Sequence, residues 1–219
     1  MPPKVLYFDL GKVLVDFSHE RMCTQMAEVA GTTPQVVWDA LFSDGTCRAA
    51  EIRYEMGQIS TDEFLDCFCR ETGTSPDRQR LTDAVCDIFS PIEPMWQLTR
   101  SLAAAGNRLA LMSNTNVVQW RYITDGRFPL VAMGRPASVF DWAILSYEVG
   151  TMKPDRAIYE AAIARAGVAP HEVFFTDDRS ENVEGARAVG IDAVQFVNTD
   201  QLLSELRARE VPGTTIIGK

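Results

Sequence analysis

Basic residues are scarce in this sequence, and long apolar runs are absent. Lys and Arg total 21 of 219 residues against 30 Asp and Glu, which gives a formal net charge of -9. Since no basic cluster offsets that charge, we do not expect a nucleic acid as a partner. The N-terminal apolar run is interrupted by Asp9, Lys12 and Asp16, and no longer run follows. The sequence therefore predicts neither a signal peptide nor a membrane span, and we expect a cytoplasmic protein without a membrane partner.

The sequence also lacks the patterns of zinc sites and of the common nucleotide folds. The five cysteines are odd in number, which without a secretory signal indicates free thiols. Cys67 and Cys69 form a CxC pair, but residues two apart on a helix do not share a face. No second pair and no neighbouring histidine completes a zinc set. The chain contains neither a GxxxxGK loop nor a GxGxxG turn.

Short apolar runs that alternate with helical patterns give the first indication of the fold. Hydrophobic residues make up 46% of the chain and charged residues 23%, the balance of a soluble globular protein with ample material for a core. The alternation predicts an α/β fold, with a parallel Rossmann-like sheet and helices on both faces. A short apolar tail, Thr214–Ile217, follows the last helical pattern. The predicted strands are Lys4–Asp9, Arg108–Met112, Trp142–Leu145, Val173–Thr176 and Ala193–Phe196.

The region from residue 17 to 92 has a different character. It contains all five cysteines and no convincing strand. Thr33-Pro34 and Ser75-Pro76 each place a capping residue before a proline at the first helical position. Ser60 and Glu63 have the spacing of a capping box. We therefore predict an all-helical insert over residues 17–92, and an α/β core made of residues 1–16 and 93–219.

Two polar clusters end the first two predicted strands of the core, at the edge where open α/β sheets bind ligands. Asp9 ends a buried strand, and Gly11 follows in a turn whose backbone N–H groups can face a phosphate. A carboxylate held there can attack phosphorus and form an acyl phosphate, although a strand-ending Asp also caps ordinary turns. Ser113 and Asn114 offer a hydroxyl and a backbone N–H to phosphate oxygens, but they too are common in turns.

Two further clusters supply charge. Lys153 precedes Pro154, which fits the first turn of a helix running to about Ala166. Its ammonium group can neutralise a nucleophile and a transferring phosphoryl group, or it can be solvated. Asp177 and Asp178 are adjacent acids that repel each other unless a cation lies between them, and hard oxygen ligands suit Mg²⁺. The alternative for this pair is the capping of a helix.

In this order the four clusters resemble the haloacid dehalogenase-like hydrolase superfamily, and the insert resembles its small helical cap domain. The resemblance covers essentially the whole chain. It is closest to the branch with bacterial sugar-phosphate phosphatases, notably of the glucose-1-phosphate type, and the phosphatase domain attached to soluble epoxide hydrolase is related. It implies Mg²⁺-dependent hydrolysis of a small phosphomonoester, specifically a sugar phosphate, through an aspartyl-phosphate. The segments that carry the resemblance are FDLGKVLVDF, MSNTN, GTMKPD and FFTDDRSENVEGA.

The resemblance also implies a role for each residue. Asp9 would be the nucleophile, and Lys153 would bridge the nucleophile and the phosphate. Asn182 matches a position that often orients the metal site. The implied Mg²⁺ ligands are Asp9, the Gly11 carbonyl and Asp178, with Asp177 at the ion or beside it. The residues implied to hold the phosphate are Leu10, Gly11, Ser113, Asn114 and Lys153.

Gly11 departs from the pattern of many phosphatases in this superfamily. They carry a second Asp two residues after the nucleophile, as general acid for the leaving alcohol, and its loss typically costs about 10²–10⁴-fold in rate. Three explanations are open. The substrate has a better leaving group, such as an anomeric oxygen; another group such as Asp16 takes over; or the protein is a slow or lapsed enzyme. The sugar-phosphate branch tends to have Gly here, which weakens the third.

Two rival functions remain beside the phosphatase. In a metal-independent haloacid dehalogenase the halide leaves without protonation, but the acidic pair Asp177-Asp178 favours Mg²⁺ and phosphate. A catalytically lapsed binding module of the same fold is the other rival. The expected partner is a small phosphorylated metabolite, and the expected state is a monomer or a weak homodimer.

Residues of the insert should close over the strand ends and exclude water. Arg53, Tyr54 and Glu55 lie near a predicted helix end and either face the site or, as we expect, the solvent. Trp38 and Phe42, at helical spacing, are expected in the core of the insert.

Overall fold

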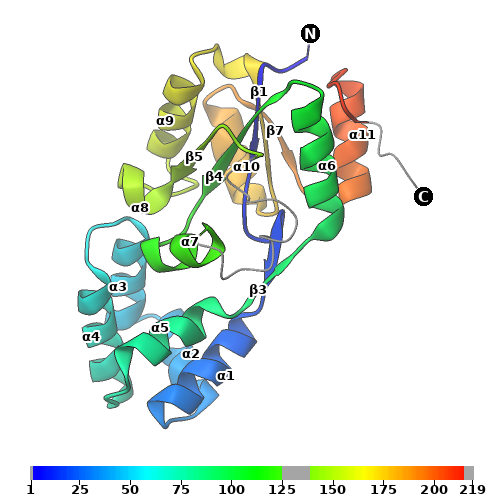
Figure 1. The fold of residues 1–219 in the computed structure, drawn as a ribbon. Coiled ribbons are helices and arrows are strands. Elements are labelled where there is room, and N and C mark those ends of the chain that lie inside the picture. Colours follow the sequence, from blue (N-terminus) through cyan, green and yellow to red (C-terminus); the bar gives the residue numbers. More distant parts are fainter. Residues whose placement is uncertain (1, 125–138, 215–219) are drawn as a thin grey trace.

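Parallel strands form the central sheet of the protein in the computed structural model, which describes residues 2–124 and 139–214 (Figure 1). β1 lies in the middle and pairs with β4 on one side and β6 on the other. The parallel α/β sheet predicted from the sequence is confirmed, with each predicted strand found within two residues of its predicted bounds. The order across the sheet is β5 (Trp142–Leu145), β4 (Arg108–Ser113), β1 (Val5–Phe8), β6 (Val173–Asp177) and β7 (Asp192–Gln195).

Helices cover both faces of this sheet, as predicted. Leu6 and Phe8 of β1 point into a cluster with α6 (Glu93–Ala104) and α11 (Thr199–Ala208). Val5 and Tyr7 point the opposite way, into a cluster with α9 (Arg156–Ala166) and α10 (Ser180–Ala188). Successive side chains of a strand face opposite sides of the sheet, and helices cover both sides here. All four residues of β1 are therefore buried, which explains the unbroken apolar run in the sequence.

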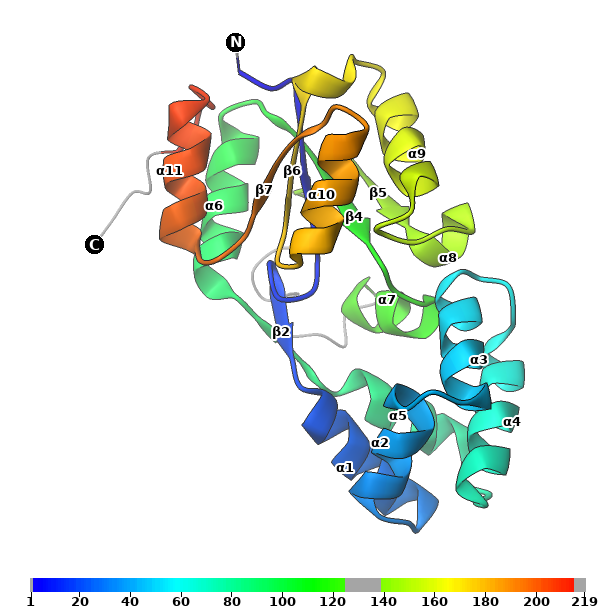
Figure 2. The ribbon, with the colours of Figure 1, turned by 180° about the vertical axis from the view of Figure 1, so that it is seen from behind.

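The helical insert lies beyond the carboxyl ends of the strands, at the lower end of the molecule in Figure 2. Its helices surround their own apolar cluster, which includes Met26, Leu41, Phe68 and Leu81. Thr33 caps α2 and Ser60 forms the predicted capping box of α4. The helices are α1 (His19–Ala30), α2 (Pro34–Phe42), α3 (Thr46–Glu55), α4 (Thr61–Thr72) and α5 (Arg78–Cys86).

Two short strands join the insert to the core, and the sequence did not predict them. β2 (Val15–Phe17) and β3 (Phe89–Pro91) pair antiparallel, so β3 lies inside the region that we expected to lack strands. Three residues are too few to display the two-residue period of a strand, which is why this ribbon escaped prediction. The chain enters and leaves the insert through this ribbon.

Two helix starts differ from their predicted positions. α5 begins at Arg78, capped by the Asp77 carboxylate rather than by Ser75. α9 begins at Arg156, because Asp155 is extended and occupies the N-cap position, so Pro154 precedes the helix; the Lys153–Pro154 peptide bond is cis. The remaining elements are α7 (Val117–Thr124), α8 (Ser146–Val149) and a 3-10 turn at Pro170–Glu172.

Some surface features also bear on the predictions. Trp38 is 38% exposed, so its expected position in the core of the insert is wrong. Its ring contacts Phe42, which is partly buried against the insert cluster. The cysteines are free thiols, as predicted. Within residues 2–124 and 139–214, no helix combines the length and apolar character needed to cross a bilayer. The predicted apolar tail lies outside the described residues beyond Thr214.

Candidate active site

Four sequence clusters that lie far apart along the chain meet at the carboxyl edge of the sheet. Asp9 directly follows β1, Ser113 ends β4 and Asp177 ends β6. Lys153 comes from the loop between α8 and α9. Asp9, Ser113, Lys153 and Asp177 are all buried, and the structure thus brings residues of the four predicted clusters together in space.

The Lys153 ammonium group is the centre of this cluster. It donates to Asp9 Oδ1 at 2.7 Å, to Asp177 Oδ2 at 2.6 Å and to the Met112 carbonyl at 2.9 Å. An ammonium group has three donors, so each of them has an acceptor. The Lys153 side chain is only 1% exposed, and a charge this deeply buried is tolerated because two carboxylates surround it.

The backbone around Lys153 is fixed by Asn114. The Asn114 side chain accepts from Lys153 N–H at 2.8 Å and donates to the Lys153 carbonyl at 2.9 Å. Gly185 of α10 lies against the same loop, and a Cβ there would stand 2.8 Å from the Pro154 carbonyl oxygen. The loop is thus held from two sides, and this holds the ammonium group between the carboxylates.

Burial and mutual proximity shift the ionisation of these groups. Burial raises the pKa of the Asp9 carboxyl to about 7, against the lowering effect of the Lys153 charge. Burial also raises the pKa of Asp178, with a further contribution from the neighbouring Asp177 charge. For Lys153 burial acts to lower the pKa, but the charges of Asp9 and Asp177 outweigh it and raise the pKa. Lys153 therefore stays charged.

Asp9, Asp177 and Asp178 form a group that fits a divalent cation. Each offers a carboxylate oxygen, and these oxygens lie within 4.8 Å of one another. Three carboxylates against the single Lys153 ammonium leave an excess of negative charge, and hard oxygen donors are the ligands that Mg²⁺ prefers. The donor set therefore fits the magnesium ion that the sequence predicted.

Asp177 and Asp178 have different surroundings. Asp177 is fully buried and accepts from Lys153, from Arg179 N–H at 2.9 Å and from the Asn182 amide at 2.9 Å. Asp178 is only half-buried. From the resemblance we expected Asn182 to orient the metal site. In the structure its amide holds the Asp177 carboxylate. Both oxygens of Asp177 already have protein donors, so Asp9 and Asp178 are the better candidates for direct ligands.

Four of the five residues predicted to hold a phosphate line one cavity at the strand ends, whereas Lys153, like Asp9, is not among the residues of its wall. Leu10, Gly11, Ser113 and Asn114 all contribute to its wall. Among the residues that the structure describes, the hydrogen-bond partner of Ser113 Oγ is the Asn114 carbonyl, at a long distance of 3.4 Å. A hydroxyl so weakly bound within the protein is well suited to donate to a ligand oxygen instead.

A side chain at position 11, such as the acidic one of the superfamily pattern described above, would have to displace the Phe17 ring. A Cβ on Gly11 would lie 2.9 Å from Cε1 of the Phe17 ring. Asp16, the replacement considered from the sequence, does not line the cavity. It pairs with Lys12 at 2.5 Å on the surface, and this hydrogen bond lowers its pKa. A carboxyl group that holds its proton less tightly and points elsewhere is a poor general acid, so the structure does not support Asp16.

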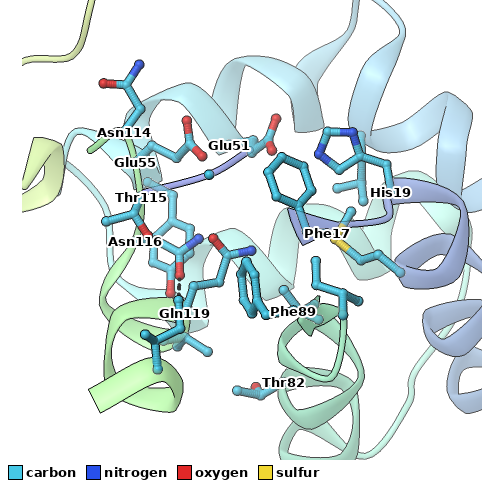
Figure 3. A pocket seen from close by; sticks show the side chains of 18 of the residues that line it. Phe17, His19, Glu51, Glu55, Thr82, Phe89, Asn114, Thr115, Asn116 and Gln119 are labelled. Atoms are coloured by element: carbon cyan, nitrogen blue, oxygen red, sulfur yellow. Dashed lines mark hydrogen bonds between the residues drawn. The ribbon is translucent and has the colours of Figure 1, made fainter. Parts of the chain in front are cut away.

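The cavity extends from the strand ends into the helical insert (Figure 3). Its volume is about 150 Å³. The core contributes the loops after β1 and β4 together with α7, and the insert contributes side chains from α1 to α5. A ligand bound at Ser113 would therefore have its organic part enclosed by the insert.

Sequence reasoning missed two residues of this cavity. Tyr54 and Glu55 were expected to face solvent, but both line the cavity, whereas Arg53 is exposed as expected. Gly57 has a φ of +65°, and a Cβ there would stand 2.1 Å from the Tyr147 carbonyl oxygen of α8. This close approach docks the end of α3 on the core and brings Glu55 beside the strand ends. A glycine two residues after Glu55 was the signal available in the sequence.

Glu55 has the electrostatic character of a proton-transfer group. Burial raises the pKa of its carboxyl to about 7, with a further contribution from the Glu51 charge, against the effects of Arg48 and Arg179. Figure 3 shows Glu55, Glu51 and Asn114 among the side chains that line the cavity. A carboxyl group with this pKa is partly protonated near neutral pH, which is what a general acid requires.

Comparison with known proteins agrees with the geometry. The sequence profile of haloacid dehalogenase-like hydrolases matches residues 3–190. The chain is 24% identical over 205 residues to D-ribitol-5-phosphate phosphatase of Bacteroides thetaiotaomicron, covering 93% of this chain and 96% of that protein. It is 28% identical over 155 residues to flavin mononucleotide hydrolase 1 of Arabidopsis thaliana, covering 71% of this chain and 60% of that longer protein.

Solved structures share the same fold. The wild-type crystal structure of a haloacid dehalogenase family enzyme from Bacteroides thetaiotaomicron, in complex with magnesium and inorganic phosphate, has a TM-score of 0.75. It is 26% identical, and the match covers 88% of this chain and 93% of the other. L-2-haloacid dehalogenase from Xanthobacter autotrophicus is more distant, at 19% identity and a TM-score of 0.62 over 94% of this chain and 83% of the other.

The resemblance seen in the sequence is thereby confirmed. The matched profile spans all four polar clusters, and the phosphatase relatives cover both the sheet and the insert. The chain belongs to the haloacid dehalogenase-like hydrolase family and is a hydrolase.

Proposed function

We propose that the protein is a Mg²⁺-dependent phosphatase that hydrolyses a small phosphomonoester through an aspartyl-phosphate on Asp9. The observation that carries this proposal is the buried arrangement of Asp9, Lys153 and Asp177, with Asp178 beside them. Two carboxylates held by one ammonium group at the edge of a cavity have little purpose as a fold-stabilising device, because burying such charges is costly. The phosphatase relatives support the same reaction class.

Each residue of the site has a place in this reaction. One Asp9 oxygen forms a bond to phosphorus while the bond from phosphorus to the leaving oxygen breaks. Ser113, the Asn114 N–H and the turn at Leu10 and Gly11 hold the phosphate oxygens. Lys153 neutralises charge on Asp9 and on the transferring phosphoryl group. Water then attacks phosphorus, which releases inorganic phosphate and restores Asp9.

A magnesium ion bound by Asp9, Asp178 and the Gly11 carbonyl would offset the negative charge of the phosphate in this site. Lys153, Arg179 N–H and Asn182 already donate to the Asp177 carboxylate. Asp177 would therefore orient Lys153 rather than contact the ion.

Glu55 is our candidate for the general acid that protonates the leaving oxygen, because position 11, where the superfamily pattern has an acidic residue, is a glycine. It lines the same cavity as Gly11 and Ser113 and comes from the insert rather than from the sheet. The charged and titratable groups around it are Glu51 and Arg48 on its own helix, Arg179 after β6 and His19 across the cavity. The proton would pass from the Glu55 carboxyl to the leaving oxygen, and the Glu55 carboxylate would later accept a proton from the attacking water.

The insert over residues 17–92 serves in this proposal as the cap of a core made of residues 1–16 and 93–219. It supplies most of the cavity wall and keeps bulk water from the reacting phosphate. The sugar-phosphate substrate, the cytoplasmic location and the state as monomer or weak homodimer stay predictions from the sequence.

A phosphatase assay on the purified protein tests the proposal. We expect release of phosphate from p-nitrophenyl phosphate and from a panel of metabolite phosphomonoesters in Mg²⁺, but not in EDTA. Asp9→Asn should abolish it. Activity that survives EDTA or Asp9→Asn would contradict the mechanism. Halide release from 2-haloacids without metal would favour the dehalogenase. Binding of phosphate without turnover would favour the lapsed module.

A further inference from the structure

The wall of the cavity is largely apolar, which bears on the organic part of the substrate. Away from the strand ends the lining consists mainly of aliphatic, methionine and phenylalanine side chains. Most of these belong to the insert, whose helices thus leave an opening in their own apolar cluster. Prominent among them are Met22, Met26, Leu41, Phe64, Val85 and Ile88.

Polar side chains interrupt this apolar lining at several places. Besides the residues at the end of β4 and directly after it, they are His19, Glu51, Tyr54, Glu55, Thr61, Thr82 and Gln119. Glu51 and Glu55 lie near Asn114 in Figure 3, and Thr82 lies at the far end of the cavity from them. Glu51 is already paired with Arg48. A polyhydroxylated group such as a sugar needs a hydrogen-bond partner for each hydroxyl that leaves water, and the aliphatic, methionine and phenylalanine side chains of this wall offer none.

The apolar character reaches Gly11, two residues after Asp9. The Phe17 ring occupies the space beside Gly11 in which a side chain at that position would lie. Phe89 stacks edge-on against Phe17, with ring centroids 6.2 Å apart, and also lines the cavity. A leaving group bound here therefore contacts aromatic rings directly after its ester oxygen.

The volume sets the size of the group that fits. An apolar cavity of about 150 Å³ holds a ligand the size of benzene. Because this volume includes the strand-end part of the cavity, a substrate whose phosphate lies at Ser113 and Asn114 has room for an organic group of at most about six carbon atoms.

We propose that the substrate is the phosphate ester of an apolar alcohol, an aryl or short alkyl or prenyl group of about six carbons that lies between the helices of the insert. The inference rests on the proposed phosphatase function and replaces the sugar suggested by the resemblance with a hydrophobic leaving group. Its specificity comes from the cavity wall, because the phosphate-holding residues contact only the part that all phosphomonoesters share.

A homologous series of ligands tests this proposal. n-Alkylphosphonates from methyl to octyl, which cannot be hydrolysed, are added as inhibitors of Mg²⁺-dependent p-nitrophenyl phosphate hydrolysis. Each buried methylene should lower the inhibition constant about fourfold, and the gain should level off near six carbons. Hexylphosphonate should also inhibit more strongly than glucose 1-phosphate or ribitol 5-phosphate.

Thr82→Phe, at the far end of the cavity, sharpens the test. The added ring fills the inner space, so the gain with chain length should disappear. Thr24→Phe is the matched control: Thr24 lies on α1, its hydroxyl bonds the carbonyl four residues back as that of Thr82 does, and it does not line the cavity. This control should keep the chain-length gain. Circular dichroism and the melting temperature show that both variants are folded.

The outcomes separate the inference from the proposed function. If p-nitrophenyl phosphate is not hydrolysed in an Asp9-dependent way, the phosphatase proposal fails and the inference falls with it. If hydrolysis is present but the inhibition constant is independent of chain length, or the sugar phosphates inhibit more strongly, the inference alone is wrong. A chain-length gain that survives Thr82→Phe would also overturn it.

Discussion

The strand-end cluster and the wall of the insert cavity enclose one site but are built on opposite principles. At the strand ends, Asp9, Lys153 and Asp177 are buried charges held by specific hydrogen bonds. In the insert, the wall consists mainly of apolar side chains of varied shape, with polar groups such as Glu55 and Thr82 between them. In the proposed reaction, the first region would recognise what all phosphomonoesters share, and the second would recognise what distinguishes one from another.

This difference explains which part of the function can be predicted from the sequence and which part requires the structure. A phosphoryl-transfer site needs a particular residue type at each position, because charge and donor geometry must match the phosphate. An apolar wall needs only volume and shape, which many residues provide. The reaction class therefore follows from motifs, whereas the substrate class follows from the three-dimensional cavity.

Glu55 joins the two regions, and its removal should have the largest effect among the following predictions. We expect Glu55→Gln to lower kcat for alkyl phosphates by about 10²–10⁴-fold, and to matter far less for p-nitrophenyl phosphate, whose leaving group needs no proton. Because the pKa of Glu55 is about 7 and the donor must be protonated, wild-type activity should fall as the pH rises above about 7.

The pH profile of kcat separates Glu55 from its neighbour. Glu55→Gln should remove the fall at high pH. Glu51→Gln removes a nearby negative charge that raises the Glu55 pKa, so it should move the fall to lower pH without abolishing it. If the fall persists unchanged in Glu55→Gln, then Glu55 does not donate the proton, and the cavity wall has no catalytic part.

Replacement of Lys153 tests the strand-end cluster in the same way. Lys153→Met leaves Asp9 and Asp177 without their shared cation, so we expect a loss of about 10²–10³-fold in kcat/KM. Breaking a buried pair also costs about 3–5 kcal/mol in the free energy of unfolding, which urea titration in EDTA would measure.

Lys12→Met is its matched control, because Lys12 also pairs with an aspartate, Asp16, but at the surface. Exposed pairs contribute about 0–1 kcal/mol, so Lys12→Met should be nearly neutral. Equal losses of stability in the two variants would show that the Lys153 pair is not buried as described.

Replacement of Gly57 tests the contact that brings the insert to the strand ends. Among the replacements that we expect to lower activity, it should have the smallest effect. A Cβ at Gly57 collides with the Tyr147 carbonyl, so Gly57→Ala should displace α3 and lower kcat/KM. Gly73→Ala is the control: its φ is +66°, but nothing lies within 4 Å of the added methyl group.

Thermal or urea unfolding compares these two glycine variants. Both bear the strain of the left-handed conformation, and Gly57→Ala should cost about 1–3 kcal/mol more because of the steric overlap. If the two variants behave alike, then the end of α3 does not rest on α8, and Glu55 has no fixed place in the site.

Much of the fold and the strand-end cluster could be predicted because each depends on local patterns. Both faces of the sheet are covered, so β1 and the first three residues of β6 are continuously apolar and easy to recognise. Parallel strands have their carboxyl ends at one edge, so polar residues that follow each run must meet there. Asp9, Ser113 and Asp177 come together for this reason.

What escaped prediction depends on contacts between distant segments. The orientation of Tyr54 and Glu55 is set by the contact of α3 with α8, about ninety residues away, which no local pattern reveals. The Phe17 ring over Gly11 depends on the three-residue ribbon of β2 and β3. Trp38 was placed in the core by its helical spacing, but spacing alone does not say which face of α2 is covered.

The covalent state of Asp9 tests the central claim most directly. The enzyme is mixed with substrate and Mg²⁺ and quenched with borohydride, which reduces an acyl phosphate to an alcohol, and the peptide around Asp9 is analysed by mass spectrometry. We predict that Asp9 is converted to homoserine only when substrate and Mg²⁺ are both present. Turnover of substrate with Asp9 never modified, under conditions that trap a synthetic acyl phosphate, would contradict the account.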